Sequence, residues 1–160
     1  LAAMGCRILH TARHPVPDAL GDFRPLDALL ADSDIVSLHV PLTEATERMI
    51  DAKALGRMKP GAILINTARG GLVDEAALAA ALADGTIDAA GADVLVTEPP
   101  DPANPLFKLP NVVLSPHNAA APLECYAKMS RRAVLNLTEY FDGKLDPGYT
   151  VNPESLGKNR

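Results

Sequence analysis

The sequence predicts an α/β fold in which helices alternate with the strands of a parallel, doubly wound sheet. Five short apolar segments, rich in β-branched residues, are separated by segments whose apolar residues have helical spacing. Several of the five are almost continuously apolar, which is typical of strands covered on both faces. Regular alternation of strands and helices indicates right-handed crossovers between parallel strands.

The elements follow one another in a regular order. The expected strands span residues 7–11, 34–39, 62–66, 89–95 and 112–115, and the expected helices span residues 25–31, 51–58, 74–84 and 124–142.

Local signals support the ends of these helices. Pro25 suits a first helical turn, and the Pro60-Gly61 pair ends the second helix. The third helix opens on Asp74-Glu75 and is followed by Gly85, and Gly143 follows the fourth.

Composition limits the class of protein. A chain of 160 residues with 48% hydrophobic residues supports one core, and a net charge of −5 disfavours a nucleic-acid surface. No apolar run approaches the roughly 20 residues that cross a bilayer, and we see no signal peptide. Cys6 and Cys125 are best interpreted as free thiols. We therefore expect a cytoplasmic protein without membrane or nucleic-acid partners. Because the chain opens on LAAMGCRIL, the pattern of a helix end entering a strand, we also expect residues upstream of Leu1.

Polar residues collect where the expected strands end. The second strand is followed by His39-Val40-Pro41, the third by Arg69 and two glycines, the fourth by Glu98, and the fifth by His117. Ligands of open α/β sheets bind beyond the carboxyl ends of the strands. The convergence of an arginine, a carboxylate and a histidine on this edge predicts a functional site.

Each of these residues also has a plain alternative. A lone arginine after a strand is usually solvated, but Gly70-Gly71 permits a tight turn that directs the Arg69 guanidinium inward, where its planar fork suits a carboxylate. His117 could cap the last helix, and Glu98 could be a loop charge. If the two residues are neighbours, however, the carboxylate fixes the tautomer of the imidazole and favours its protonated form, which suits a proton donor.

Asp93 lies inside an apolar strand, where an unpaired carboxylate would be costly. It needs either a structural network or a ligand amide, and both alternatives stand. His10 and His14 have no comparable setting, and we interpret them as structural residues or as residues at the edge of a cofactor.

Four segments carry a resemblance to a known family. INTARGGLVDEAAL, GADVLVTEPP, NPLFKLPNVVLSPHNAA and YTVNPE together resemble the D-isomer-specific 2-hydroxyacid dehydrogenases, up to about residue 153. The resemblance implies a Rossmann-type nucleotide-binding domain over residues 1–145 and an irregular tail over 146–160 that returns toward a separate substrate domain. It also implies a homodimer and hydride exchange between a nicotinamide ring and a small 2-oxo or 2-hydroxy acid.

The resemblance also implies residue roles. Arg69 would bind the substrate carboxylate, His117 would exchange the proton of the alkoxide, and Glu98 would hydrogen-bond His117. Asp93 would bind the nicotinamide carboxamide. The residues that would complete the cofactor site are His39, Val40, Pro41, Thr46, Thr67, Ala68, Ala119 and Ala120. No metal is implied, and Glu98 argues against the similar formate dehydrogenase branch, which carries an amide in that role.

The end of the first strand bears on the choice of cofactor. Folds that prefer NAD place an acid for the ribose hydroxyl at the end of the second strand of the complete sheet. Residues 5–11 align with that strand, and Ala12, followed by Arg13, stands in the place of the acid. We therefore favour NADP(H), with NAD(H) as the alternative. The pattern most resembles glyoxylate/hydroxypyruvate or 2-ketogluconate reductases, with phosphoglycerate and D-lactate dehydrogenases as alternatives.

Two departures from the family pattern leave other functions open. The chain has no G-x-G-x-x-G loop, and the first strand and the substrate domain are expected upstream. Five strands here and one upstream would complete six, and without it a sheet face or edge would be exposed. The alternatives to an enzyme are a non-catalytic, dinucleotide-sensing protein like the corepressors that resemble this family, or a truncated inert domain.

Overall fold

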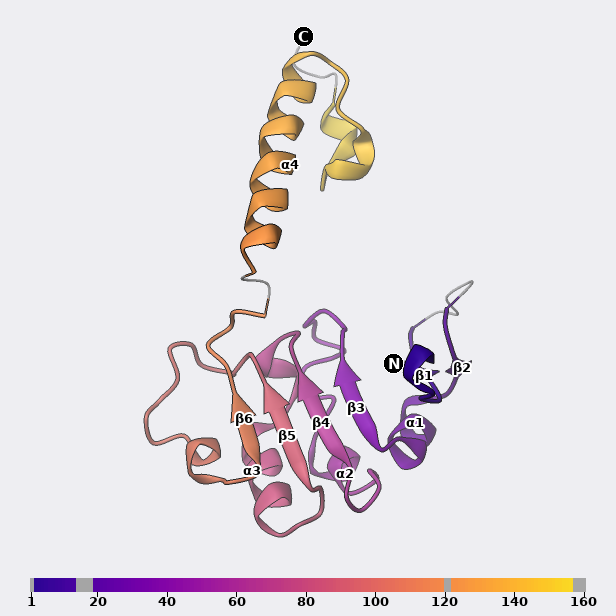
Figure 1. The fold of residues 1–160 in the computed structure, drawn as a ribbon, viewed down its shortest axis with the longest axis vertical. Helices are drawn as coiled ribbons and strands as arrows, with labels where there is room; N and C mark the ends of the chain where they lie inside the picture. The colour runs from indigo at the N-terminus through magenta and orange to yellow at the C-terminus, as the bar shows by residue number, and fades with distance from the viewer. Residues whose placement is uncertain (1, 14–18, 120–121, 157–160) are drawn as a thin grey trace. The chain divides into compact units, whose positions relative to one another are not determined.

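The computed structural model describes residues 2–13, 19–119 and 122–156 (Figure 1). The chain divides into two compact units, Leu1–Asn118 and Ala119–Arg160. The first unit contains all the strands and the helices α1 to α3, and the second contains α4. Each unit is described by itself.

A four-stranded parallel sheet forms the centre of the first unit. Its strands, in spatial order, are β3 (Ile35–Leu38), β4 (Ile63–Asn66), β5 (Ala89–Ala92) and β6 (Val112–Leu114). Asn66 at the end of β4 pairs with Leu38 on one side and with Ala92 on the other, and Ala92 pairs with Leu114. The carboxyl ends of the four strands are therefore level, and the loops that follow them start at one edge.

The helices of the first unit confirm the sequence prediction, with one helix shifted by a residue and the other two shorter. They are α1 (Leu26–Asp32), α2 (Ala52–Leu55) and α3 (Glu75–Ala83). Asp51 and Asp74 are N-caps, because their carboxylates accept from backbone N–H groups at 2.8 and 3.0 Å. The second helix ends earlier than expected, since Gly56 is already its C-cap.

The sheet has one covered face and one open face. Val36, Leu64 and Ala90 are buried in the same core as Leu78 and Leu82 of α3. On the opposite face, Ile35 is 58% exposed and Val113 is 74% exposed. Within the first unit this face is exposed, whereas the continuous apolar pattern had indicated strands covered on both faces.

The first predicted strand does not join the central sheet. β1 (Leu9–His10) pairs in parallel with β2 (Asp22–Phe23), and the two form a separate sheet. All five expected segments contain a strand, and the described residues add a sixth, β2. The pattern missed β2 because it has only two residues, both exposed, which is too short for any periodicity. In the described residues, β1 and β3 each pair along one edge only.

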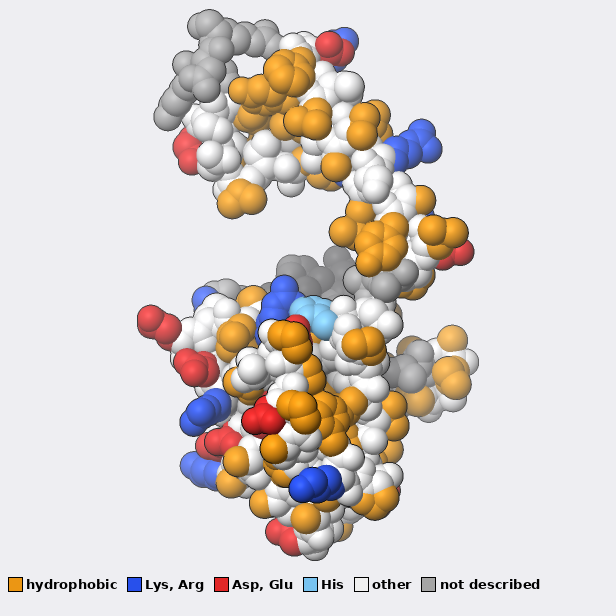
Figure 2. All heavy atoms as spheres, turned by 90° about the vertical axis from the view of Figure 1, so that its left-hand side faces the viewer, with side chains coloured by type: hydrophobic (Ala, Val, Ile, Leu, Met, Phe, Trp, Pro, Cys, Tyr) orange, Lys and Arg blue, Asp and Glu red, His pale blue; other side chains and the backbone are white. Residues whose placement is uncertain are grey.

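The second unit consists of a long helix and the tail behind it. Its elements are α4 (Leu123–Phe141) and two short 3-10 helices, η4 (Pro147–Tyr149) and η5 (Pro153–Ser155). The guanidinium of Arg132 lies 4.2 Å from the ring centroid of Tyr149 and contacts Asn136 and Glu139, which ties the tail to the helix. Hydrophobic side chains are exposed along α4 (Figure 2). Among the described helices, none has the length and apolar character needed to cross a bilayer.

Gly70 lies against the backbone of the segment that follows β5. A Cβ atom at Gly70 would be 2.1 Å from the carbonyl carbon of Leu95 and 2.4 Å from the nitrogen of Val96. We expect Gly70→Ala to lower the free energy of unfolding by at least about 2 kcal/mol, because rigid backbone must move. Urea unfolding of the full-length protein measures the change.

Gly91→Ala is the matched control. A Cβ atom there would be 3.1 Å from Cδ1 of Ile65, the end of a flexible side chain, so we expect a change below about 1 kcal/mol. Equal effects of the two substitutions would contradict the close backbone approach.

Candidate active site

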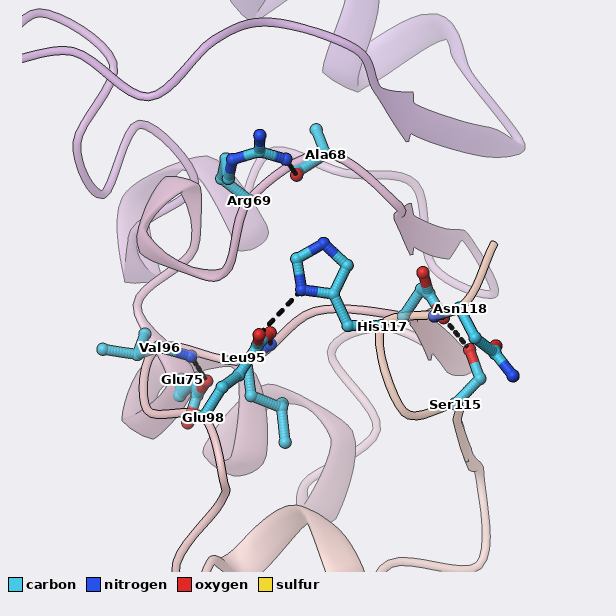
Figure 3. Close-up of polar contacts among 10 residues, drawn as sticks. Ala68, Arg69, Glu75, Leu95, Val96, Glu98, Ser115, His117 and Asn118 are labelled. Carbon is cyan, nitrogen blue, oxygen red and sulfur yellow. Dashed lines mark hydrogen bonds and ion pairs between the residues drawn. The ribbon is translucent and has the colours of Figure 1, made fainter. Parts of the chain in front are cut away.

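A pocket of about 320 Å³ lies beyond the carboxyl ends of β4, β5 and β6. Its chemistry-bearing residues are Arg69, Glu98 and His117, which follow these three strands in that order. Its remaining lining residues are Leu42, Gly70, Gly71, Val94, Leu95 and Val96. The structure therefore brings together the three residues that the sequence placed on this edge (Figure 3).

Arg69 is presented by a turn that Asn66 closes. The Asn66 side chain, in a residue only 4% exposed, donates from Nδ2 to the Arg69 carbonyl at 2.9 Å and accepts from the Ala68 N–H at 3.1 Å. The guanidinium is exposed and donates to the Ala68 carbonyl at 2.6 Å. Among the described residues, no carboxylate pairs with it. Its fork is thus available to an anion.

His117 has a left-handed backbone conformation, with φ of 51°. Histidine tolerates this region better than most residues, but the conformation persists only where neighbours enforce it. The His117 N–H donates to the Asp93 carbonyl at 2.8 Å. The Asp93 carboxylate accepts from Ser115 Oγ at 2.5 Å and from the Asn118 N–H at 2.9 Å. Asp93, which is 5% exposed, is therefore part of a structural network that shapes the His117 turn.

His117 and Glu98 form a hydrogen-bonded pair. Nδ1 of His117 lies 2.7 Å from Oε2 of Glu98, whose Oε1 accepts from the Leu95 N–H at 3.0 Å. An ionised carboxylate only accepts, so Nδ1 carries the hydrogen and Nε2 is the atom left for a ligand. Figure 3 shows that Nε2 faces the side on which Arg69 lies.

The hydrogen bond from His117 lowers the pKa of Glu98 below its ordinary value of 4.5, with a smaller contribution from the Leu95 N–H. Because the folded pKa is lowered, the stabilisation that the pair provides is complete above pH 4.5 and is lost as the pH falls through the folded pKa. NMR titration of the Glu98 carboxyl carbon should give a midpoint below 4.5 in the wild type and a higher midpoint in His117→Ala. An unchanged midpoint would show that the pair is not formed.

The residues predicted to line the cofactor lie mostly at the same edge. Thr46 Oγ1 donates to the Pro41 carbonyl at 2.7 Å and accepts from the Thr43 N–H at 2.8 Å, which closes the turn after β3. Nε2 of His39 lies 2.8 Å from Ser37 Oγ. Val40 is partly buried.

The other predicted cofactor residues are less closely grouped. Thr67 and Ala68 follow β4, whereas the exposed Arg13 follows β1 in the separate sheet. Ala119 is exposed in the second unit, and Ala120 lies outside the described residues.

Two residues that support the site, Glu75 and Asn104, were not predicted from the sequence. Glu75 was interpreted only as an acidic helix start, but its carboxylate accepts from the Val96 N–H at 2.5 Å and from Asn104 Nδ2 at 2.9 Å. The only sequence signal was a second acid beside Asp74, which already caps α3.

Within the described residues, no group of three or more His, Cys, Asp or Glu side chains is placed to hold a metal ion.

Comparisons with known proteins identify the family of the chain. Residues 1–119 match the family described as "D-isomer specific 2-hydroxyacid dehydrogenase, NAD binding domain". A glyoxylate reductase from Korarchaeum cryptofilum is 47% identical over 154 residues, which are 94% of this chain and 46% of that protein. The chain spans about half the length of the curated relatives that it matches.

Two similar solved structures contain different cofactors. A D-isomer specific 2-hydroxyacid dehydrogenase from Lactobacillus delbrueckii ssp. bulgaricus, in an NAD complexed form, has a TM-score of 0.83 and 35% identity, covering 91% of this chain and 48% of that one. An NADPH-dependent glyoxylate/hydroxypyruvate reductase from Sinorhizobium meliloti, in complex with NADP and malonate, has a TM-score of 0.81 and 38% identity, covering 88% and 44%. The chain therefore belongs to the D-isomer-specific 2-hydroxyacid dehydrogenase family and contains its nicotinamide-dinucleotide-binding domain.

Proposed function

We propose that the protein containing this chain is an oxidoreductase that transfers hydride between NADP(H) and a small 2-oxo or 2-hydroxy acid, with D stereospecificity. The observation that carries the proposal is the pocket in which Arg69 lies opposite a hydrogen-bonded His117–Glu98 pair. An anion-binding fork next to an acid–base group is what reduction of a 2-oxo acid requires.

The described residues fit a bound dinucleotide. The segments after β3 and β4 expose His39, Pro41 and Thr67 at the pocket edge of the sheet, and these would line the cofactor. Nδ1 of His10 is buried without a hydrogen-bond partner in the described chain, at the end of β1 just before Ala12 and Arg13. An unpaired buried polar atom at this strand end favours a ligand there. We propose that Asp93 combines its structural network with binding of the nicotinamide carboxamide, and that the backbone of Ala119 and Ala120 contributes to the cofactor site.

The residues would act on the substrate as follows. When bound, the dinucleotide supplies or accepts the hydride. Arg69 binds the substrate carboxylate with its planar fork and so orients the adjacent carbonyl. His117 donates a proton from Nε2 to the carbonyl oxygen as negative charge develops there, and it removes the hydroxyl proton in the reverse direction. Glu98 holds the ring at Nδ1 and stabilises the imidazolium form.

The preference for NADP(H) rests on the end of β1. Ala12 leaves no carboxylate to repel a phosphate on the ribose, and the exposed Arg13 provides a positive charge. The Sinorhizobium relative, which is NADPH-dependent, is consistent with this proposal.

The organisation of the whole protein is also a proposal. Because the curated relatives are about twice as long as the chain, we propose a separate substrate domain. The homodimer that the family resemblance implies is also a proposal. In that organisation, residues 1–145 form the nucleotide-binding domain and 146–160 lead toward the substrate domain.

A substrate panel tests the function. The full-length protein is mixed with NADPH or NADH and with glyoxylate, hydroxypyruvate or 2-ketogluconate, and oxidation of the cofactor is followed by absorbance. We expect oxidation of NADPH with at least one of the acids. No oxidation of either cofactor with any 2-oxo acid would contradict the enzyme, and a strong preference for NADH would contradict the role of Ala12 and Arg13.

A further inference from the structure

Two contacts join the segment that carries Arg69 to the segment that carries Glu98. Gly70 approaches the backbone of Leu95 and Val96 so closely that no side chain fits between them. Five residues after Gly70, the carboxylate of Glu75 accepts from the Val96 N–H at 2.5 Å. The two segments are thus fixed to each other by a backbone contact and a charge-assisted hydrogen bond.

Glu75 also fixes the far end of the second segment. Its other carboxylate oxygen accepts from Asn104 Nδ2 at 2.9 Å. Oδ1 of Asn104 accepts from the N–H of Leu106, which is 2% exposed and part of the core. The loop that contains Glu98 is therefore attached to the first turn of α3 at Val96, on one side of Glu98, and at Asn104, on the other.

The connection continues directly to the acid–base pair. Val96 follows Leu95, whose N–H donates to Oε1 of Glu98 at 3.0 Å. The second oxygen of Glu98 binds Nδ1 of His117 at 2.7 Å. A single carboxylate on α3 thus fixes the loop from which Glu98 reaches His117, as Figure 3 shows.

We propose that Glu75 is a positioning residue that sets Glu98 against His117 and fixes both relative to Arg69. The inference rests on the proposed function. An acid in the first turn of a helix could act only through the helix dipole. Here, however, both oxygens are used by groups 21 and 29 residues further along the chain, which a dipole interaction does not require.

Substitution of Glu75 separates the two explanations. We expect Glu75→Ala to lower kcat for reduction of the 2-oxo acid by about 10- to 100-fold, because small displacements of catalytic groups are costly. The dissociation constant of NADPH should change little. The NMR midpoint of Glu98 should rise toward 4.5, because the loop no longer presents its carboxylate to His117. Glu75→Gln, which keeps an acceptor for Val96, should restore most of the lost rate.

Two further variants complete the test. Asp27→Ala removes an acid from the first turn of α1, where it pairs with Arg57 at 3.5 Å, and should leave kcat and the Glu98 midpoint unchanged. Asn104→Ser keeps a capping oxygen but cannot reach Glu75, so it should produce a smaller change of the same sign even if Glu75→Ala folds poorly.

The outcomes also separate this inference from the proposed function. An unmoved Glu98 midpoint in both Glu75→Ala and Asn104→Ser would overturn the positioning role, whatever the rates. Equal losses of kcat in Asp27→Ala and Glu75→Ala would overturn it as well. If the wild type reduces no 2-oxo acid, the proposed function fails, while the Glu98 titration still decides the role of Glu75.

Discussion

Replacing His117 by alanine is expected to lower kcat for reduction of the 2-oxo acid by about 100- to 10,000-fold, the usual contribution of a positioned proton donor. The pocket offers no substitute of the same kind, because its other charged residues in the described chain are Arg69 and Glu98. Arg69 does not give up its proton in a protein, and Glu98 stays ionised because its pKa is lowered.

Cofactor binding and the effects of other variants distinguish the loss of a proton donor from other causes of a lower kcat. The dissociation constant of NADPH, measured by cofactor fluorescence, should change little in His117→Ala, because the missing group acts on the substrate oxygen. Glu98→Gln should lower kcat less, because an amide still holds the ring but no longer stabilises the imidazolium. In the double variant the loss should be about that of His117→Ala alone, since the two residues act as a unit. A His117→Ala rate within about threefold of the wild type would contradict the assignment.

Replacing Arg69 by alanine is expected to lower kcat/KM by about 30-fold or more, since removing one partner of a charge-assisted pair costs about 2–5 kcal/mol. Much of the loss should appear as a raised KM for the 2-oxo acid, because the guanidinium binds the carboxylate in the ground state and in the transition state. Arg69→Lys keeps the charge but loses the planar fork, so it should recover only part of the loss.

Arg57→Ala is the control for loss of an arginine. Arg57 pairs with Asp27 at 3.5 Å, away from the pocket residues, so its removal should leave kcat/KM unchanged. Added guanidinium ion should partly restore the Arg69→Ala variant by occupying the vacated space. Equal KM values for the Arg69→Ala and Arg57→Ala variants would show that Arg69 does not bind the substrate.

Local pattern was sufficient for most of the fold. The segments that became β3, β4 and β6 were apolar over nearly their whole length, and Asp74 marked the start of α3 as its cap. β2 was not predicted because its two exposed residues are too few to show a periodic pattern. The pairing of β2 with β1 depends on which strands are neighbours in space. The same holds for the exposed face of the sheet at Ile35 and Val113. The sequence of a single segment does not contain this information.

The candidate site was also predictable from the sequence only in part. The approach of Arg69, Glu98 and His117 followed from the rule that parallel strands end at one edge. Sequence reasoning left Asp93 between a network and a ligand amide, and the bonds to Ser115 and Asn118 establish the network. The role of Glu75 could not be predicted from the sequence, because its partners lie 21 and 29 residues further along the chain and leave no local pattern.

Transfer of deuterium tests the central claim most directly. The full-length protein is incubated with hydroxypyruvate and NADPH that carries deuterium at both transferable positions of the nicotinamide ring. The proposed chemistry predicts D-glycerate with one deuterium on the former carbonyl carbon, and a rate that falls in both His117→Ala and Arg69→Ala. Unlabelled product, L-glycerate, or labelled D-glycerate formed at the wild-type rate by both variants would contradict it.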